Sequence, residues 1–573
     1  MKIELAKHSG FCFGVKQAVV KAVEKINRSG GTIFVYGPLI HNPQTVTILE
    51  NRGLKTINSL ADIDGKQIAI RTHGIPVNET KEIAARASGM INLTCPKVAM
   101  VQATIKKHSA QGCHTIILGD KEHAEVVGLK SFASAGVTVI SSDAEISDIP
   151  AAEKYLLVAQ TTFDRSLFDK TIGLLKQRLN DLTVVDTICD STSNRQNDVR
   201  EGIARGIDTL IVAGGKNSAN TTRLAEIGRE SGIKTFHIET EQELPFAELK
   251  DSEHILVTAG ASTPGWIINN VLERLNHIKY KKRSFVSNIL RGMLEFLVRT
   301  NCLSAAFAFF ATLFVQSASG ASIDFSLPAF SGLYIFSMYS INNYFDRELL
   351  KTGNSYKYRI YKRYGGALAL FSVVGLALSF WFIKNYSFWT QLLLVCSSIC
   401  GFLYFTTPVR SLVNSVKSAF VKNLYGSKIV TVFGWLAVVV IAPALQFQPQ
   451  GSLVLFASAL LVYLITMRHL LISCVAYQGD FIFGRLSLSI LLGIKGGKII
   501  CVLLALAAAL TCGFAVYASG NAALLLLLLP IVYYIALFAV IMRIEYPVTL
   551  QYEILIDLNL IFTAALLCII VRI

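Results

Sequence analysis

Three cysteines in the first third of the chain have the context of metal ligands. Cys12 lies between two aromatic residues and two glycines, Cys95 precedes Pro96, and Cys189 precedes Asp190. They are 83 and 94 residues apart, which fits one thiol from each of three lobes of similar size. An amphipathic run follows Cys12, and a helix N-terminus there favours the thiolate. A structural thiol is the simpler interpretation of each cysteine alone. Together they predict a metal cluster with one open coordination position.

Three histidines follow predicted strands in turns rich in Gly, Pro or acidic residues: His41, His73 and His123. Two glycine-containing turns, residues 214–220 and 258–264, add hydroxyls and amides. Neutral imidazoles, hydroxyls and amides donate hydrogen bonds without adding bulky charge, which suits a buried diphosphate. Histidine is also a zinc ligand, so a zinc site of cysteine and histidine is the alternative, although zinc-finger spacing is absent.

These motifs need a scaffold, and the first half of the chain predicts an α/β one. Short runs rich in Val and Ile alternate with helical patterns, which is typical of mainly parallel sheets. Ligand sites of such sheets lie beyond the strand ends, where the polar motifs fall. The nine predicted strands, expected to form three α/β lobes, are 32–36, 67–71, 115–118, 137–140, 155–159, 182–186, 209–212, 235–238 and 254–259. Cys113, beside one strand, is expected in the core.

The composition changes near residue 284. Residues 286–573 carry 19 Lys and Arg against 8 Asp and Glu, which is +11 of the total charge of +15. The basic excess therefore belongs to an apolar region, and nucleic acid is not an expected partner. The few cysteines of the first half and the absence of a signal-peptide pattern favour a reducing cytosolic compartment.

The second half predicts an all-α membrane domain. Nine apolar segments are long enough to cross a bilayer, approximately 300–318, 326–348, 365–384, 388–406, 425–446, 452–476, 498–518, 522–542 and 551–571. Basic residues concentrate in the even-to-odd loops, which places the first half in the cytosol. We expect domains at 1–280 and 300–573, joined by a basic amphipathic linker at 281–299 that lies against membrane lipid.

Acidic and polar residues close the second and sixth of these segments. Asn342 and Asp346 lie at the end of the second, and Asp480 lies at the end of the sixth. Carboxylates beside cations such as Lys422 at a membrane surface suit Mg²⁺-bridged diphosphate binding. Solvated loop charges are the simpler alternative.

The first half resembles the 4-hydroxy-3-methylbut-2-enyl diphosphate reductase (IspH/LytB) family. The matching stretches are GFCFGV, GPLIHNPQ, RTHGIP, TCPKV, HAEVVG, AQTTF, DTICDSTSNRQ, GGKNSANTTRL and TAGASTP. The resemblance implies three lobes in a pseudo-threefold arrangement around an iron–sulfur cluster. It also implies the last step of the non-mevalonate isoprenoid pathway, in which a C5 allylic alcohol diphosphate loses its hydroxyl to give isopentenyl and dimethylallyl diphosphates.

The resemblance also implies residue roles. Cys12, Cys95 and Cys189 would hold a [4Fe–4S] cluster whose fourth iron meets the substrate hydroxyl. Glu125 would donate a proton, with Thr161 beside it. The diphosphate would be held by His41, His73, His123, Ser218, Asn220 and Ser262. Ala219 replaces a second serine of many members. An external electron donor such as ferredoxin or flavodoxin is implied.

The second half resembles the UbiA superfamily of intramembrane prenyltransferases, through YFTTPVR, Lys422-Asn423 and GRLSLSILLG together with the acidic positions. Two expected aspartates are replaced, by Leu350 and Ala476. One hypothesis is a bifunctional enzyme, and the other is a reductase whose degenerate membrane domain acts as an anchor or prenyl-lipid binder. A membrane-tethered zinc hydrolase is the non-redox alternative.

Overall fold

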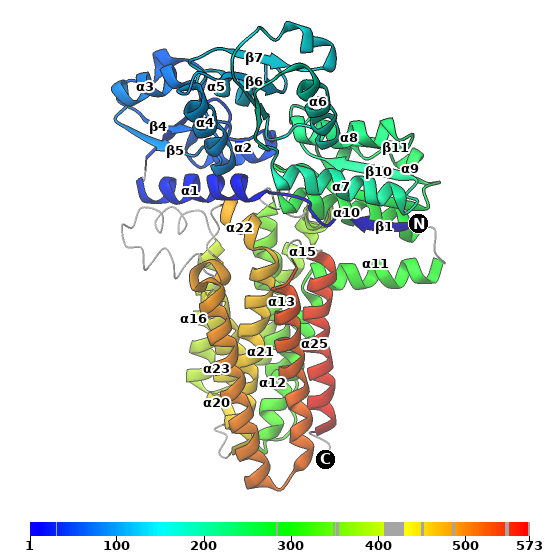
Figure 1. Ribbon diagram of the computed structural model, residues 1–573. Helices are drawn as coiled ribbons and strands as arrows, with labels where there is room; N and C mark the ends of the chain where they lie inside the picture. The colour runs from blue at the N-terminus through cyan, green and yellow to red at the C-terminus, as the bar shows by residue number, and fades with distance from the viewer. Residues whose placement is uncertain are drawn as a thin grey trace. The chain divides into compact units, whose positions relative to one another are not determined.

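A computed structural model describes residues 1–29, 31–281, 285–347, 350, 355–405, 429–447, 452–483, 487–544 and 549–570. The chain divides into two compact units, Met1–Lys279 with Ile482–Gly484, and Tyr280–Phe481 with Arg485–Ile573 (Figure 1). The first unit is α/β, and the described part of the second is helical.

The α/β unit contains three separate four-stranded sheets, and every strand pairing in them is parallel. The predicted fold class of three α/β lobes is confirmed. The strands, given sheet by sheet in spatial order, are β3 (Leu54–Ile57), β2 (Ile33–Tyr36), β4 (Gln67–Ile70) and β5 (Gly89–Asn92); β7 (Val137–Ile140), β6 (His114–Leu118), β8 (Tyr155–Ala159) and β9 (Leu182–Val184); and β11 (Lys234–Ile238), β10 (Thr209–Ala213), β12 (His254–Ala259) and β1 (Lys2–Leu5).

The three sheets share one topology. In each lobe the first strand along the chain has the second strand on one side, at the sheet edge, and the third strand on its other side. The fourth strand lies beyond the third and forms the opposite edge. In the third lobe this fourth place is taken by β1, the first strand of the whole chain, which pairs with β12. The chain therefore begins by completing its last lobe. This repeat gives equivalent turns at three places in the unit.

All nine predicted strands are present, but β1, β3 and β5 were missed. Each of these is a sheet edge, and each is only partly buried. A half-exposed edge strand does not need the continuous Val and Ile runs that mark a strand covered on both faces. The edge strands β7, β9 and β11 were nevertheless predicted, so edge position contributes to the three misses without fully explaining them.

Helices cover the sheets, and the residues between helix and sheet form separate apolar cores for the lobes. Cys113 lies in one of these cores with Val101, Ile105 and Ile117, as predicted. The helices of this unit are α1 (Phe13–Ser29), α2 (Pro43–Asn51), α3 (Val77–Arg86), α4 (Pro96–Ser109), α5 (Ala124–Lys130), α6 (Arg165–Arg178), α7 (Asp190–Ala204), α8 (Ala219–Glu230), α9 (Phe246–Leu249) and α10 (Gly265–Lys281).

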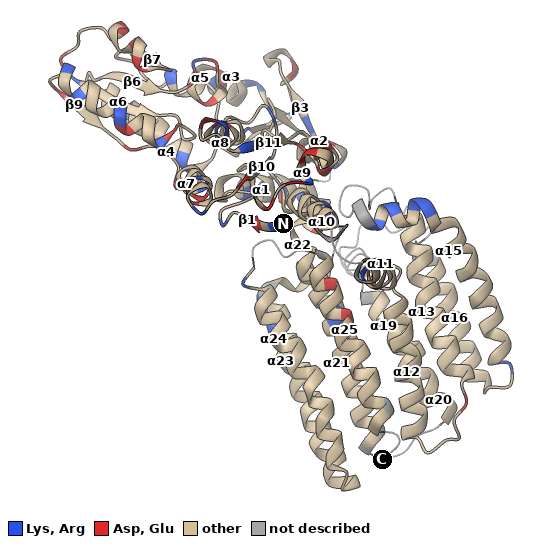
Figure 2. Ribbon diagram, turned by 90° about the vertical axis from the view of Figure 1, so that its right-hand side faces the viewer, with Lys and Arg blue, Asp and Glu red and all other residues tan. Residues whose placement is uncertain are grey.

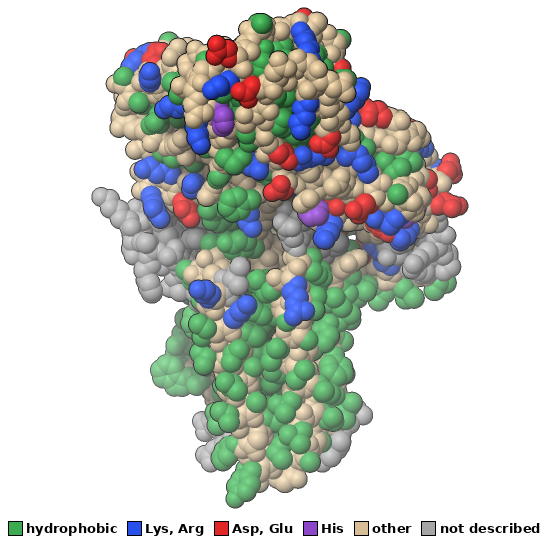
Figure 3. All heavy atoms as spheres, in the orientation of Figure 1, with side chains coloured by type: hydrophobic (Ala, Val, Ile, Leu, Met, Phe, Trp, Pro, Cys, Tyr) green, Lys and Arg blue, Asp and Glu red, His purple; other side chains and the backbone are tan. Residues whose placement is uncertain are grey.

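The second unit is a bundle whose described surface is largely apolar. Charged side chains are spread over the α/β unit but are sparse along the long helices, whose visible face is hydrophobic (Figures 2 and 3). Its helices are α11 (Phe285–Arg299), α12 (Cys302–Ala318), α13 (Ser326–Phe345), α15 (Ser355–Phe382), α16 (Phe388–Phe405), α19 (Ile429–Leu436), α20 (Ala442–Phe447), α21 (Ser452–Val475), α22 (Tyr477–Phe483), α23 (Leu488–Ser519), α24 (Leu529–Ile541) and α25 (Thr549–Ile570).

The expected number of nine membrane spans is not reached in the described residues. Six helices are long and apolar enough, and a seventh span results if the bent pair of α11 and α12 counts as one. Helix α13 falls outside this set because Ser, Asn and Tyr recur along it. Helix α16 falls outside it because its described apolar stretch, Phe388–Phe402, is short.

Candidate active site

The three cysteines occupy equivalent places in the repeated topology. Each follows the fourth strand of its lobe and immediately precedes a helix: Cys12 precedes α1, Cys95 precedes α4 and Cys189 precedes α7. Their backbone N–H groups donate to the carbonyls of Ala261, Thr72 and Thr161, each at 2.9 Å. Each of these carbonyls lies two residues beyond the third strand of a lobe. The fold thus presents three thiols in one repeated geometry.

The sulfur atoms have the surroundings of a cation-binding centre. The Sγ of Cys12 accepts from the backbone N–H of Val15 at 3.4 Å, in the first turn of α1. Burial raises the pKa of Cys95 and Cys189, and the charge of neighbouring thiols raises it further, against the lowering by helix N–H groups. The helix N–H groups alone therefore do not produce thiolates at Cys95 and Cys189. A positively charged centre among the three thiols would lower their pKa values and favour the thiolates.

A multi-iron cluster fits this donor set. Cysteine thiolates are the usual ligands of iron–sulfur clusters. The pKa of Cys95 responds to the charges of both Cys12 and Cys189, so the three thiols lie near one another.

Two residues that the sequence analysis missed hold this geometry. The buried Arg195 on α7 donates from Nη2 to the carbonyl of Gly10 at 2.6 Å and from Nη1 to the carbonyl of Ser191 at 2.7 Å. It thereby links the Cys12 loop to the helix that Cys189 precedes. Gly14 lies against Cys95, and a β-carbon at this position would overlap the Cys95 Sγ. The signal for Gly14 was the second glycine of GFCFG.

The three predicted histidines come together in the structure. The ring centroids of His41 and His73 are 4.5 Å apart. The ring centroid of His123 is 5.8 Å from that of His41 and 5.6 Å from that of His73. Burial lowers the pKa of all three, that of His41 to about 4 with a contribution from His123, so that they are neutral at pH 7. Neutral imidazoles offer one donor and one acceptor each.

The polar residues that bear on this site also repeat from lobe to lobe. His41, His123 and Ser218 each lie five residues after the first strand of a lobe. Glu125 and Asn220 each lie seven residues after that strand, in the second and third lobes. His73 and Ser262 each lie three residues after the third strand, and Ser262 donates to the carbonyl of His41 at 3.0 Å.

Glu125 and Thr161 form a buried pair. The Glu125 carboxylate accepts from the Thr161 backbone N–H at 2.7 Å and from its hydroxyl at 2.8 Å. Burial raises the pKa of Glu125 to about 7, although both of these hydrogen bonds lower it. The carbonyl of Thr161 accepts from Cys189 N–H, so the pair is directly joined to a cysteine loop. A carboxyl group with this pKa can both give and take a proton near neutral pH.

Several buried polar atoms in this region await a partner. The His41 Nε2 and both side-chain amide atoms of Asn220 are buried and make no hydrogen bond within the described structure. Ser218 and Ser262 are also buried. Because buried polar groups normally pair, Asn220 Nδ2, and His41 Nε2 in the tautomer that carries its proton, indicate a ligand with acceptor oxygens. A diphosphate has that character.

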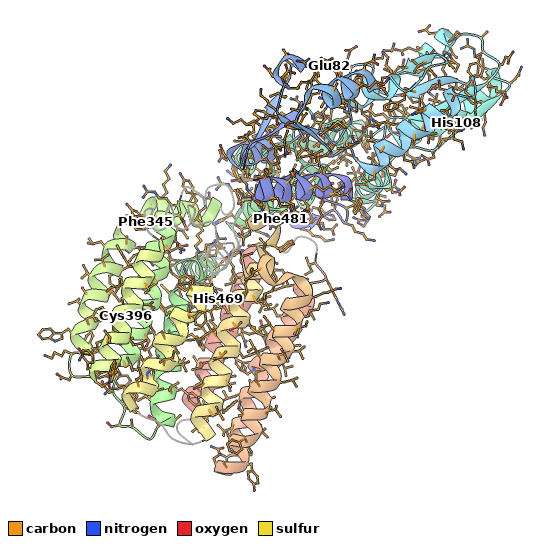
Figure 4. The ribbon with its side chains drawn as sticks, turned by 90° about the vertical axis from the view of Figure 1, so that its left-hand side faces the viewer. Glu82, His108, Phe345, Cys396, His469 and Phe481 are labelled. Carbon is orange, nitrogen blue, oxygen red and sulfur yellow. The ribbon has the colours of Figure 1, made fainter. Side chains whose placement is uncertain are left out.

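The predicted residues of the second unit lie at helix ends. Asp346 follows α13, and its N–H donates to the carbonyl of Asn342 at 2.9 Å. Asp480 lies in α22 and is buried. Lys422, Asn423 and most of YFTTPVR lie outside the described residues. In Figure 4 the neighbouring Phe345 and Phe481 lie at the same end of the helical unit.

The family model and the similar curated proteins match the first half of the chain. Residues 3–276 match the family described as LytB protein. The 4-hydroxy-3-methylbut-2-enyl diphosphate reductase of Geobacter sulfurreducens is 41% identical over 286 residues, which is 49% of this chain and 100% of that protein. The reductase of the same name from Alkaliphilus oremlandii is 36% identical over 280 residues, or 48% of this chain and 100% of that protein.

Two solved structures are each similar to about half of the chain. A structure of (E)-4-hydroxy-3-methyl-but-2-enyl diphosphate reductase is 35% identical, covers 48% of this chain and 100% of its own, and has a TM-score of 0.39. A UbiA homolog from Archaeoglobus fulgidus is 12% identical, covers 48% of this chain and 99% of its own, and has a TM-score of 0.33. The second match assigns no activity to the helical unit. Through the sequence identity of its α/β half, the chain belongs to the 4-hydroxy-3-methylbut-2-enyl diphosphate reductase (LytB) family.

Proposed function

We propose that the α/β half removes the hydroxyl of 4-hydroxy-3-methylbut-2-enyl diphosphate reductively, giving isopentenyl and dimethylallyl diphosphates. The substrate takes up two electrons and two protons, the C–O bond breaks, and the hydroxyl leaves as water. The observation that carries this proposal is the equivalent placement of Cys12, Cys95 and Cys189 after the fourth strand of each lobe.

These three thiols would bind a [4Fe–4S] cluster and leave one iron without a protein ligand. When bound, such a cluster supplies electrons and a Lewis-acidic iron. The chain's contribution is to fix the thiols before loading, through the three backbone hydrogen bonds and through Arg195. The electrons would come from an external donor such as ferredoxin or flavodoxin.

The histidines and the hydroxyl and amide donors would hold the diphosphate. With their pKa values lowered, His41, His73 and His123 bind as neutral donors and leave the anion's charge to direct hydrogen bonding. Ser218, Ser262 and Asn220 complete the ring of donors from the third lobe. Ala219, at the start of α8, offers no hydroxyl.

Glu125 would move the proton. In its protonated form it gives a proton toward the leaving hydroxyl, while Thr161 keeps the carboxyl in one orientation through two hydrogen bonds. The buried position excludes water from this group, because Glu125 is 1% exposed. A positioned proton donor contributes about 10²–10⁴-fold in rate.

The reaction is tested by supplying the C5 allylic diphosphate and a low-potential reductant to anaerobically prepared membranes. Both isopentenyl and dimethylallyl diphosphate should form in wild type and fall to background with Glu125→Gln. Failure of the wild-type enzyme, loaded with iron, to dehydroxylate the substrate would overturn the proposal.

We propose further that residues 300–573 form a multi-pass domain in the cytoplasmic membrane, with residues 1–280 in the cytosol. The six or seven apolar helices and the basic loops of the sequence support this topology. Reporter fusions after α20 and after α21 test it, since these end two consecutive apolar spans and opposite sides of the membrane are expected for the two positions.

A second candidate function is Mg²⁺-dependent prenyl transfer by this membrane domain. The Tyr339 hydroxyl and His469 Nε2 are 3.2 Å apart and join α13 to α21. Asp346 lies seven residues beyond Tyr339, and Asp480 lies eleven residues beyond His469, or about two and three helical turns at 3.6 residues each. This spacing supports a position of each aspartate on the helix face that carries the Tyr339–His469 contact.

The path from His469 to Asp480 stays helical across the break between α21 and α22. Ala476 N–H donates to Ile472 at 3.1 Å and Asp480 N–H donates to Ala476 at 2.9 Å, which continues the helical ladder. In the expected topology both carboxylates then face the same end of the bundle, where they would hold Mg²⁺ and a diphosphate, with Asn342 and Lys422 beside them. Equal prenyl transfer by wild-type membranes and by the Asp346→Asn, Asp480→Asn double variant would leave the domain as an anchor or prenyl-lipid binder.

A further inference from the structure

Helix α11 makes a fixed corner with the first apolar helix of the bundle. The segment Asn288–Arg299 is bent by 67° from Cys302–Ala318. The corner falls at Asn301, whose φ of 61° is the only positive value outside glycine in the described chain. Asparagine tolerates this left-handed conformation.

Hydrogen bonds on both sides of the corner hold it in place. Thr300 donates from its backbone N–H and from its hydroxyl to the carbonyl of Phe296, at 2.9 Å and 2.7 Å. On the other side Ala305 N–H donates to the carbonyl of Asn301 at 3.0 Å. Thr300 and Asn301 are buried. The angle between α11 and α12 is therefore built into the chain.

The apolar face of α11 points outward. Val286 is 64% exposed, Ile289 51%, Leu290 62% and Met293 59%. Phe296 continues the same face, since the spacing of these residues is that of one side of a helix. A helix packed on a protein in water normally turns this side inward.

The polar face of α11 is the more covered one. Asn288, Arg291 and Glu295 are only partly exposed, and Arg291 and Glu295 form an ion pair with an N···O distance of 2.6 Å. Val298 and Arg299, at the corner, are buried. The distribution is thus inverted relative to that of a water-facing helix, which indicates an apolar medium outside.

Charge and continuity identify this medium as a lipid surface. The stretch 279–283, directly before α11, carries four Lys and Arg and no acidic residue. Helix α11 leads without another element into α12, and the two are bent by 67° at the break. If α12 enters the bilayer along its normal, α11 therefore lies closer to the membrane plane. Basic charge beside an exposed apolar face is the pattern of interfacial helices on anionic leaflets.

We propose that α11 lies in the headgroup–acyl boundary of an anionic leaflet, with the face formed by Val286, Ile289, Leu290, Met293 and Phe296 in the acyl region. This holds whether or not the bundle transfers prenyl groups. Helix α11 then fixes the depth at which the chain enters the bilayer. The partner is lipid, bound by apolar burial and by attraction of the basic side chains to anionic headgroups.

A photo-crosslinking amino acid tests which surface the apolar face meets. The full-length protein, placed in nanodiscs of phosphatidylglycerol and phosphatidylethanolamine, carries benzoylphenylalanine at Leu290 in one sample and at Asn288, on the opposite face, in the matched control. Several-fold more lipid adduct at Leu290 is expected. Lipid adducts at Leu290 no more abundant than at Asn288, or crosslinks from Leu290 chiefly to protein peptides of this chain or of a second copy, would overturn the proposal.

A change of lipid composition separates the contribution of headgroup charge to membrane binding by α11 from the contribution of its apolar face. In nanodiscs of phosphatidylcholine alone, amide exchange in α11 should rise several-fold while α12 remains protected. Leu290→Glu with Met293→Glu should produce the same rise in the anionic nanodiscs, and Asn288→Glu should not. Equal protection of α11 in all of these samples would contradict an interfacial position.

Discussion

Removing one hydrogen bond from Glu125 should move the pH profile of the reductase. The carboxylate accepts two hydrogen bonds from Thr161, and both stabilise its ionised form. With its pKa at about 7, Glu125 is protonated below neutral pH and is then a competent donor. Turnover should therefore be level below pH 7 and fall about tenfold per unit above it.

Thr161→Val deletes the hydroxyl and keeps the backbone donor. A hydrogen bond to a charged group contributes about 1.5–3 kcal/mol, and one pKa unit corresponds to about 1.36 kcal/mol. Loss of the 2.8 Å hydroxyl bond should thus raise the pKa of Glu125 by about 1–2 units and shift the alkaline limb upward by that amount. The direction follows because the ionised form loses its support.

The assay is kcat/KM against pH under anaerobic conditions, with iron content measured in every preparation. Thr161→Ser retains a hydroxyl and is the matched control, so its profile should follow wild type. Comparison between variants cancels the titration of the substrate diphosphate. An unshifted alkaline limb in Thr161→Val, with normal iron content, would refute the assignment of the proton donor to Glu125.

Three further outcomes follow from packing and charge. Gly14→Ala should lose most bound iron, because its β-carbon would overlap the Cys95 sulfur. The matched control Gly173→Ala, whose β-carbon would meet open space, should keep its iron, and iron analysis of both variants distinguishes them. Arg195→Met should load iron but lose its visible absorbance several-fold faster in air, with partial rescue by Arg195→Lys, and equal decay rates would contradict its positioning role. Arg468→Met should destabilise the bundle by about 3–5 kcal/mol by leaving Asp557 buried without its cation; adding Asp557→Leu should restore thermal stability, and failure to do so would refute the ion-pair argument.

The sequence predicted the parts of the fold that carry strong hydrophobic or chemical patterns. Nine strands were predicted from their runs of Val and Ile. The turns that carry the motifs were predicted from their Gly and Pro residues. The edge strand β1 was not identified, and with it the fact that the start of the chain completes the last lobe. That pairing joins residues more than 250 positions apart and has no local signal.

The site residues were proposed from motifs, whereas their arrangement comes from topology. The equivalence of His41, His123 and Ser218 depends on strand ends that the sequence places only approximately. Arg195 lies within the matching stretch DTICDSTSNRQ without a role of its own there, and only the fold brings it to Gly10. Burial raises the pKa of the Cys95 thiol although two helix N–H groups lower it, and this burial is not visible in the sequence.

The measurement that tests the central claim most directly is iron and acid-labile sulfide per chain after anaerobic purification. Wild type and Cys113→Ala, whose thiol lies in an apolar core, should contain about four of each, as a [4Fe–4S] cluster requires. Replacing Cys12, Cys95 or Cys189 by serine should remove most of both. Zinc in place of iron, or undiminished iron in those three variants, would contradict the account.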